Sequence, residues 1–306
     1  MRLVFMGTPE IARVCLAEVL RQGHEVAGVY TRQDKPVGRK QVLTAPPVKV
    51  LAEENEIPVF QPQSLRDAGQ VAQLRELAPA LIVVVAYGLL LPPQVLDIPQ
   101  YGCINLHVSL LPQYRGAAPI QWAVIHGEEK TGLTVMQMDE GLDTGPILTQ
   151  EEIAIGPDTT AGELLEEVAP LGGRLLAETI SALEGATIRA VPQKGPSSAA
   201  PSLDKTMAQL DFEKAAGRMH NLVRGCNPWP LAWFTHEGKR VQVLRTKKAD
   251  GRGKPGEVLH TDPLTIACGR GALALLHLKP EGKKAMTGTQ WAMGRRLGPG
   301  DVLANR

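Results

Sequence analysis

The stretch LVFMGTPE occupies residues 3–10 and combines two patterns. Its first four residues form an apolar run that ends at Gly7, which is typical of a buried β-strand. Pro9 then opens a segment whose apolar residues recur at helical spacing from Ile11 to Leu20, and proline is favoured in the first turn of a helix. We therefore predict that a buried strand leads directly into a helix.

The same alternation of strand and helix continues along the first half of the chain. Apolar runs at 26–30, 58–60 and 81–86 predict further strands, and the segment from Val48 to Asn55 predicts a helix. This pattern predicts an α/β domain, in which helices cover both faces of a doubly wound, Rossmann-like parallel sheet. The first turn reads GTPE rather than G-x-G-x-x-G, so a nicotinamide cofactor is not expected.

The chain changes character near residue 190. A long amphipathic helix is predicted over 159–183, and the segment VPQKGPSSAAPS at 191–202 is rich in proline and serine. Short alternating segments follow, which favour a small β-barrel. We predict a first domain at 1–189, a linker at 190–203 and a smaller, OB-like β-barrel domain at 204–306.

Composition is that of an ordinary folded protein. Of the 306 residues, 43% are hydrophobic and 21% are charged, and no apolar run approaches the roughly 20 residues that a membrane-spanning helix needs. The start MRLVFMG lacks the regions of a signal peptide, so we expect a cytoplasmic protein that does not bind a membrane. The four cysteines lack the paired spacing of a zinc site or a disulfide framework, so no structural metal is expected.

Charge is distributed unequally along the chain. Through Ser202 there are 15 Lys and Arg against 23 Asp and Glu, for a net charge of −8, whereas the remainder has 18 against 9, for +9. Clustered cations attract phosphates over a distance, so we expect the C-terminal part to face a polyanion. The alternative is a basic domain without such a partner.

Two polar side chains lie at the end of a strand predicted from residue 103. Asn105 and His107 are two residues apart, so in an extended strand they project from the same face. An amide donates to an oxygen that gains negative charge, and an imidazole exchanges protons near neutral pH, so the pair suits acyl transfer. Asp143 follows the next strand and is the carboxylate that we expect to orient the imidazole. The alternatives are a hydrogen-bonded pair in the core and an ordinary turn aspartate.

Several segments taken together resemble one known family. NLHVSLLPQYRGAAPIQWA at 105–123 and GLDTGPIL at 141–148 closely resemble the methionyl-tRNA formyltransferase family, which FMGTPE and VVVAYGLLLP also match. The resemblance covers essentially the whole chain. It implies transfer of the formyl group of 10-formyltetrahydrofolate to the amino group of methionine on initiator tRNA, through a tetrahedral intermediate. The family's catalytic triad falls on Asn105, His107 and Asp143.

The resemblance also implies where the two substrates bind. The folate site falls on three parts of the chain, namely Ser109, Leu110, Leu111 and Pro112, then Ala86, Tyr87, Gly88 and Leu89, and finally Asp139. The tRNA contacts fall on the long basic loop at 34–48 and on the C-terminal domain, with Lys35, Arg39, Lys40, Lys247 and Lys248 as candidates. A loop that is merely solvated is the alternative for 34–48. We expect a monomer.

Other functions remain open at the level of sequence. Formylation of glycinamide ribonucleotide needs no basic second domain, and enzymes that formylate a nucleotide-linked amino sugar normally carry a further sugar-nucleotide domain. A folate hydrolase that releases formate would use the same triad, with water in place of the amine. A non-catalytic RNA-binding module would not need all of Asn105, His107 and Asp143.

Overall fold

The computed structural model describes residues 1–38 and 41–303, and the chain separates into two compact units. The first unit consists of Met1–Gly116, Thr131–Ile153 and Leu165–Ala199. The second consists of Ala117–Lys130, Ala154–Leu164 and the residues from Ala200 onwards. Two short stretches that precede the predicted linker in sequence therefore belong to the second unit.

The first unit is built on a sheet that has seven strands within the described residues, in the order β5-β2-β1-β6-β7-β8-β9. Strands β5, β2, β1, β6 and β7 run parallel to one another. Strand numbers fall from β5 to β1 and then rise from β6 to β9, so the direction of winding changes between β1 and β6. The strand bounds are β1 (Arg2–Gly7), β2 (Glu25–Tyr30), β5 (Val59–Phe60), β6 (Leu81–Val85), β7 (Cys103–His107), β8 (Lys130–Gln137) and β9 (Ile147–Ala154).

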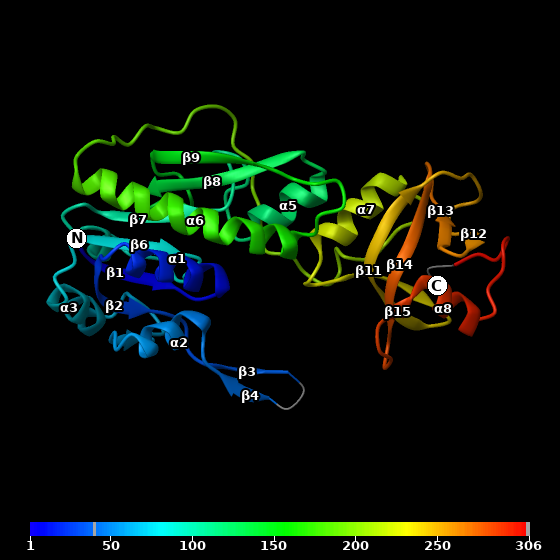
Figure 1. Ribbon diagram of the computed structural model, residues 1–306, viewed down its shortest axis with the longest axis horizontal. Coiled ribbons are helices and arrows are strands. Elements are labelled where there is room, and N and C mark those ends of the chain that lie inside the picture. The colour runs from blue at the N-terminus through cyan, green and yellow to red at the C-terminus, as the bar shows by residue number, and fades with distance from the viewer. Residues whose placement is uncertain (39–40, 304–306) are drawn as a thin grey trace. The chain divides into compact units, whose positions relative to one another are not determined.

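Helices cover both faces of this sheet (Figure 1). On one face, Met6 and Val84 pack with residues of α3 (Ala68–Glu76) and α4 (Pro93–Leu96). On the other face lie α1 (Glu10–Arg21), which packs against α2 (Pro47–Glu54), and α6 (Ala161–Glu184). Gly172 of α6 lies close to Leu106 of β7, since a methyl group at Gly172 would stand 2.8 Å from that side chain. The predicted doubly wound, Rossmann-like domain is confirmed.

Strand β8 departs from the parallel pattern. It runs antiparallel to β7, with Ile104 opposite Gln137 and His107 opposite Thr134. The connection from β7 to β8 includes α5 (Pro119–His126), which belongs to the second unit and so forms no crossover helix on the sheet. The sheet is therefore parallel from β5 to β7, as expected, and antiparallel at β8, a direction that the sequence did not indicate.

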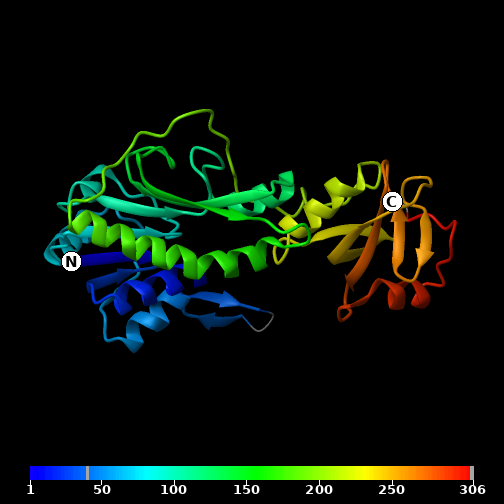
Figure 2. The same cartoon turned by 45° about the horizontal axis from the view of Figure 1, so that its top comes forward.

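A two-stranded hairpin replaces most of the long basic loop predicted at 34–48. Strands β3 (Lys35–Val37) and β4 (Val42–Thr44) pair antiparallel and project away from the sheet of the first unit (Figures 1 and 2). Both strands are exposed along their whole length. Arg39 and Lys40, which were predicted to contact tRNA, lie outside the described residues.

The second unit contains an antiparallel sheet whose main path runs β10-β11-β14-β13-β12, with β15 paired to β14. Phe234, Leu273 and Trp291 belong to its hydrophobic core. The predicted smaller, OB-like β-barrel domain is confirmed as an antiparallel strand domain. Among the described residues, the end strands of the path, β10 and β12, are not paired with each other. The bounds are α7 (Ala216–Gly225), β10 (Ala232–His236), β11 (Lys239–Ala249), β12 (Val258–Thr261), β13 (Leu264–Ala267), β14 (Ala272–Pro280), β15 (Met286–Thr287) and α8 (Gly288–Gly294).

The predicted linker is bonded to the first unit over much of its length. Val191 exchanges two backbone hydrogen bonds with Ile147 of β9, and further bonds follow as far as Ser198. In Figure 1 this segment is the yellow-green connection that follows α6. Its composition predicted little packing because it lacks large apolar side chains, but hydrogen bonds from backbone and polar side chains attach it without them.

Within the described residues, no helix is both long enough and apolar enough to cross a membrane.

Candidate active site

His107 is the last residue of β7, and its ring lies between two oxygen atoms. Its Nε2 is 2.8 Å from the carbonyl oxygen of Tyr114, and its Nδ1 is 3.6 Å from Oδ2 of Asp143. Because a carbonyl oxygen only accepts, Nε2 carries a proton and donates it to Tyr114. Nδ1 is therefore the ring nitrogen that remains for a substrate, and it faces a carboxylate.

Asp143 lies on the loop between β8 and β9. Since β8 is antiparallel to β7, this loop starts beside Cys103, the first residue of β7. The carbonyl of Cys103 accepts a hydrogen bond of 2.7 Å from the backbone N–H of Met138. The loop then brings Asp143 to His107, at the opposite end of β7. The φ angle of Asp143 is +53°, in the left-handed region that non-glycine residues rarely adopt. Its Oδ2 accepts a hydrogen bond of 2.8 Å from the backbone N–H of Gly116. The carboxylate is thus fixed by a second loop.

Asn105 lies two residues before His107 in β7, as the sequence predicted. In the ladder it stands opposite Val84 of β6 and Met136 of β8, so the strand is paired on both sides at this position. Alternation along the strand directs the Asn105 side chain to the same face as that of His107. The structure therefore brings His107 and Asp143 together and places Asn105 on the same strand face.

Asp139, a predicted folate residue, folds the loop that carries Asp143. Its Oδ1 accepts from the backbone N–H of Gly141 at 3.0 Å and from Oγ1 of Thr144 at 2.7 Å. The residue is exposed. Its carboxylate therefore already organises the turn between β8 and β9.

The segment 109–112, also predicted to bind folate, forms several hydrogen bonds with other residues of the protein. The hydroxyl of Thr134 donates to the carbonyl of Ser109 at 2.6 Å and accepts from the N–H of Leu111 at 3.2 Å. The carbonyl of Leu111 accepts from Gln150, and the buried Ser109 hydroxyl donates to the carbonyl of Gln113. These bonds hold the segment in a fixed position directly after His107.

The third predicted folate segment, 86–89, follows β6 and is less constrained. Ala86 and Gly88 are exposed and have φ angles of +47° and +83°, whereas Tyr87 is buried between them. Among the described residues, the hydrogen bonds of this loop outside the sheet involve only the Tyr87 carbonyl, which accepts from Oγ1 of Thr8 at 3.0 Å. The loop therefore presents free backbone groups at the carboxyl end of a parallel strand, where such sheets bind ligands.

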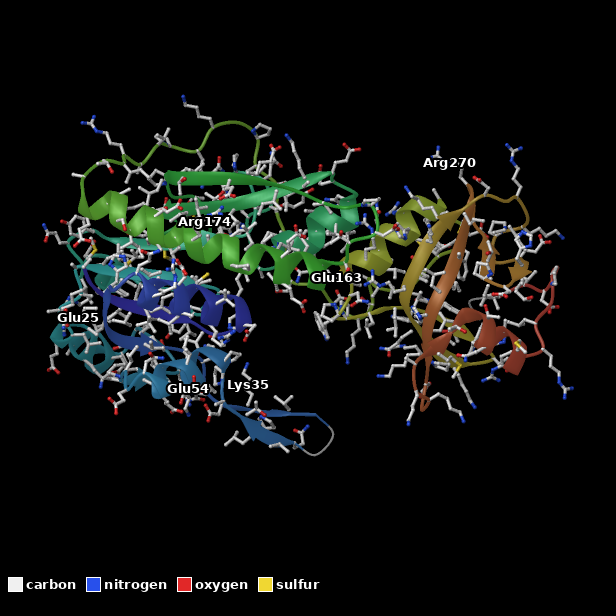
Figure 3. The ribbon with its side chains drawn as sticks, in the orientation of Figure 1. Glu25, Lys35, Glu54, Glu163, Arg174 and Arg270 are labelled. Carbon is white, nitrogen blue, oxygen red and sulfur yellow. The ribbon has the colours of Figure 1, made fainter. Side chains whose placement is uncertain are left out.

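The predicted tRNA residues within the described part of the chain are exposed. Lys35 begins the β3–β4 hairpin (Figure 3), and Lys247 and Lys248 lie on β11. Neighbouring residues of a strand project to opposite faces, so the two β11 lysines do not point the same way. The adjacent pair read from the sequence is thus two separate cations.

Sequence reasoning missed two groups that fix the predicted pair. They are the carbonyl of Tyr114, which holds His107, and the N–H of Gly116, which holds Asp143. Both are backbone groups of one short loop. A pattern of side chains does not predict a backbone contact, so the sequence gives no indication of these two groups.

Within residues 1–38 and 41–303, no group of three or more His, Cys, Asp or Glu side chains is placed to hold a metal ion. The four cysteines are free and buried, and burial raises the pKa of the Cys103 thiol, at the start of β7, to about 12.

Comparison with known proteins matches both parts of the chain to one family. Residues 1–180 match the formyl transferase family, and residues 202–296 match the C-terminal domain of formyl transferases. A methionyl-tRNA formyltransferase from Acetivibrio thermocellus is 45% identical over 309 residues, which cover 99% of each chain. One from Myxococcus xanthus is also 45% identical, over 98% of this chain and 96% of its own. The chain belongs to the methionyl-tRNA formyltransferase family.

More distant solved structures share the fold of this family member. HypX from Aquifex aeolicus, solved with tetrahydrofolic acid, matches 95% of this chain and 47% of its own at 18% identity, with a TM-score of 0.66. An N-formyltransferase from Helicobacter canadensis, solved with folinic acid and dTDP-3-aminofucose, matches 89% and 98% at 18% identity, with a TM-score of 0.68. At these identities the likeness concerns the fold alone.

Proposed function

We propose that this chain transfers the formyl group of 10-formyltetrahydrofolate to the α-amino group of methionyl initiator tRNA, through a tetrahedral intermediate, for the initiation of translation. The observation that carries the proposal is the contact between His107 and Asp143 at the end of β7, with Asn105 on the same strand face. Relatives that match nearly the whole chain are named methionyl-tRNA formyltransferases, which supports tRNA as the acceptor.

In this proposal the triad stabilises charge and moves one proton. The Asn105 amide and the protonated His107 ring donate to the oxygen of the formyl group as it becomes negative. Because Nε2 is engaged with Tyr114, the donating nitrogen of His107 is Nδ1. Asp143 keeps the ring in place and helps to remove the proton of the attacking amine. As the bond between the amine nitrogen and the formyl carbon forms, the bond from that carbon to the folate nitrogen breaks, and the departing folate nitrogen takes up the proton. Bound 10-formyltetrahydrofolate supplies the one-carbon group.

The proposed folate site consists of the loop after β6, the segment after His107 and the exposed carboxylate before Asp143. The loop residues are favoured because their backbone groups are free, and the φ angle of +83° at Gly88 suits glycine and leaves no Cβ in the way of a flat ring. The proposed residues are Ala86, Tyr87, Gly88, Leu89, Ser109, Leu110, Leu111, Pro112 and Asp139.

The proposed tRNA contacts are cationic and lie on both units. Lys35 lies on β3, and Lys247 and Lys248 lie on β11, whereas Arg39 and Lys40 are proposed from the sequence alone. The net charge of +9 after Ser202 supports a role in holding phosphates. We assign residues 1–189 to catalysis and 204–306 to tRNA binding, with 190–203 as the connector.

The finer details of this proposal are a monomeric state and a cytoplasmic location, where initiator tRNA is used. Sedimentation at several concentrations checks the first, and the location of the tagged chain checks the second.

A transfer assay tests the function. The native chain is incubated with 10-formyltetrahydrofolate and with either initiator or elongator methionyl-tRNA, and formyl-methionine is measured. The proposal predicts rapid transfer to the initiator and much slower transfer to the elongator. Release of formate without transfer would indicate a hydrolase, and tRNA binding without turnover would indicate a binding module.

A further inference from the structure

Gln193, in the predicted linker, contacts the loop that carries Asp143. Its Nε2 donates to the carbonyl of Asp143 at 2.8 Å and to the carbonyl of Gly145 at 2.9 Å. Its Oε1 accepts from Nη2 of Arg115 at 2.6 Å and from Nε of Arg115 at 3.2 Å. Both donors and the acceptor of one side chain are thus engaged, and they join two loops that are far apart in sequence.

Ser198, five residues later, contacts the loop that holds the ring of His107. Its hydroxyl accepts from the backbone N–H of Tyr114 at 2.8 Å and donates to Oε1 of Gln113 at 2.8 Å. Its carbonyl accepts from the N–H of Arg115 at 2.8 Å. Because the Tyr114 carbonyl is the partner of His107, Ser198 fixes the peptide on the other side of the same residue.

Burial along this segment follows the contacts. Gln193 and Ser198 are partly buried, whereas the four residues between them, 194–197, are exposed. Residues 193–198 therefore lie against the rest of the first unit through these two side chains. Gln193 bonds to both loops that meet at the His107–Asp143 contact, and Ser198 bonds to the loop that holds His107.

The backbone at Asp143 needs such support. Its φ angle of +53° is unfavourable for a residue with a side chain and persists where surrounding contacts hold it. The carboxylate is held by Gly116, and Gln193 holds the carbonyl of the same residue. Losing the second contact frees the peptide to rotate, which moves the carboxylate relative to Nδ1 of His107.

We propose that Gln193 is a positioning residue for formyl transfer, which sets the place of Asp143 relative to His107. The inference rests on the proposed function. Glutamine suits this place because a neutral amide donates to two carbonyls and accepts from a guanidinium at once. A glutamate keeps the acceptor for Arg115 but loses both donors and brings negative charge towards two carbonyl oxygens.

The test compares Gln193→Met and Gln193→Glu with Lys194→Ala, a change at the neighbouring exposed position. Gln193→Met keeps the length of the side chain and removes its hydrogen bonds, so it separates positioning from loss of bulk. Formyl transfer is measured in single turnovers as a function of pH, together with the KM for 10-formyltetrahydrofolate and the Kd for initiator tRNA. The midpoint of thermal unfolding is recorded for each variant.

Both Gln193 variants are expected to lower kcat by roughly 10- to 100-fold, since small misplacements of a catalytic group have effects of this size. Their pH profiles are expected to differ from the native one, with KM and Kd within about twofold of native values and Lys194→Ala fully active. An unchanged kcat and pH profile with a lower unfolding temperature would make Gln193 merely structural and overturn the inference. A loss confined to the Kd for tRNA would also overturn it, by making the segment an RNA contact.

The proposed function and the positioning role of Gln193 are contradicted by different results. A native chain that transfers no formyl group contradicts the proposed function, whereas an active native chain with active Gln193 variants contradicts only the positioning role.

Discussion

At the scale of single residues, the site depends on what faces each nitrogen of His107. A backbone carbonyl occupies Nε2, and a carboxylate with a 12% exposed side chain faces Nδ1 at 3.6 Å. That distance exceeds an ordinary hydrogen bond, so the pair is an electrostatic contact rather than a tight bond. The negative charge of Asp143 is therefore what matters at Nδ1.

Asp143→Asn removes this charge and keeps an oxygen that accepts from Gly116. We expect formyl transfer to slow by roughly 10²–10³-fold, which is typical for the loss of one electrostatic contribution to a transition state. Glu140→Gln removes a charge from an exposed position of the same loop and is the matched control. Equal activity of the two variants in single turnovers would show that the loop charge is general and that Asp143 has no special role.

Gly145 fixes the shape of the same loop at the level of the backbone. A Cβ at this position would stand 1.8 Å from the carbonyl oxygen of Gln137, so the backbone has to move. Gly145→Ala is therefore expected to lower kcat and the unfolding temperature together. Gly217→Ala, inside α7 where nothing lies within 4 Å of the new methyl group, is expected to be neutral or to stabilise by about 0.4–1 kcal/mol. Full activity of Gly145→Ala would mean that the loop tolerates displacement.

At the scale of elements, the sequence predicted what depends on local periodicity. The strand containing Asn105 and His107, and the common face of these residues, follow from the two-residue repeat of a strand. Strands β3 and β4 lie in a segment that was predicted as a loop, because three-residue strands show too little alternation to be recognised.

Contacts between distant segments left no local pattern. Strand β8 pairs antiparallel with β7, after a connection through α5 in the second unit, and no local pattern in β8 indicates its direction. The Gln193 contacts cross 48 to 78 residues of sequence, and serine- and proline-rich composition indicated only a linker. Such contacts depend on the assembled fold, which single-sequence patterns do not encode.

Helix α7 carries a buried histidine that makes stability depend on pH. Nδ1 of His220 accepts from Oγ1 of Thr246 at 2.9 Å, and Nε2 donates to the carbonyl of Pro157 at 3.0 Å. One accepting and one donating nitrogen correspond to the neutral form of the ring. Burial lowers the pKa of His220 below its ordinary 6.5, with smaller opposing contributions from Pro157 and Asp158. The unfolded chain therefore binds a proton at a higher pH than the folded one.

The contribution of His220 to the free energy of unfolding is therefore fully present above pH 6.5. It decreases as the pH falls from 6.5 towards the lowered pKa of the folded state. We expect the native free energy of unfolding to fall by up to about 1.4 kcal/mol per pH unit more than that of His220→Gln in this window. Denaturant unfolding at pH 7.5, 6.5 and 5.5 measures the difference. The exposed His260→Gln should follow the native curve, and a native curve parallel to that of His220→Gln would contradict the assignment.

At the scale of the whole molecule, the division of charge predicts how tRNA affinity responds to salt. If six to ten phosphates are neutralised, affinity falls by about 10³–10⁵-fold between 50 and 200 mM salt. Since Lys247 and Lys248 project from opposite faces of β11, single alanine changes should differ. Replacing the lysine that contacts a phosphate should lower the slope of tRNA affinity against salt concentration by about 1. Replacing the other lysine should leave that slope unchanged. A flat salt dependence would exclude electrostatic docking.

The central claim is that Asn105, His107 and Asp143 together carry out formyl transfer to methionyl initiator tRNA. The most direct test is the single-turnover rate for the native chain and His107→Ala, with 10-formyltetrahydrofolate saturating and the tRNA Kd measured in parallel. We predict that the variant loses at least about 10²-fold in rate while its tRNA affinity stays within a few-fold of native. Transfer by His107→Ala at the native rate would contradict the account.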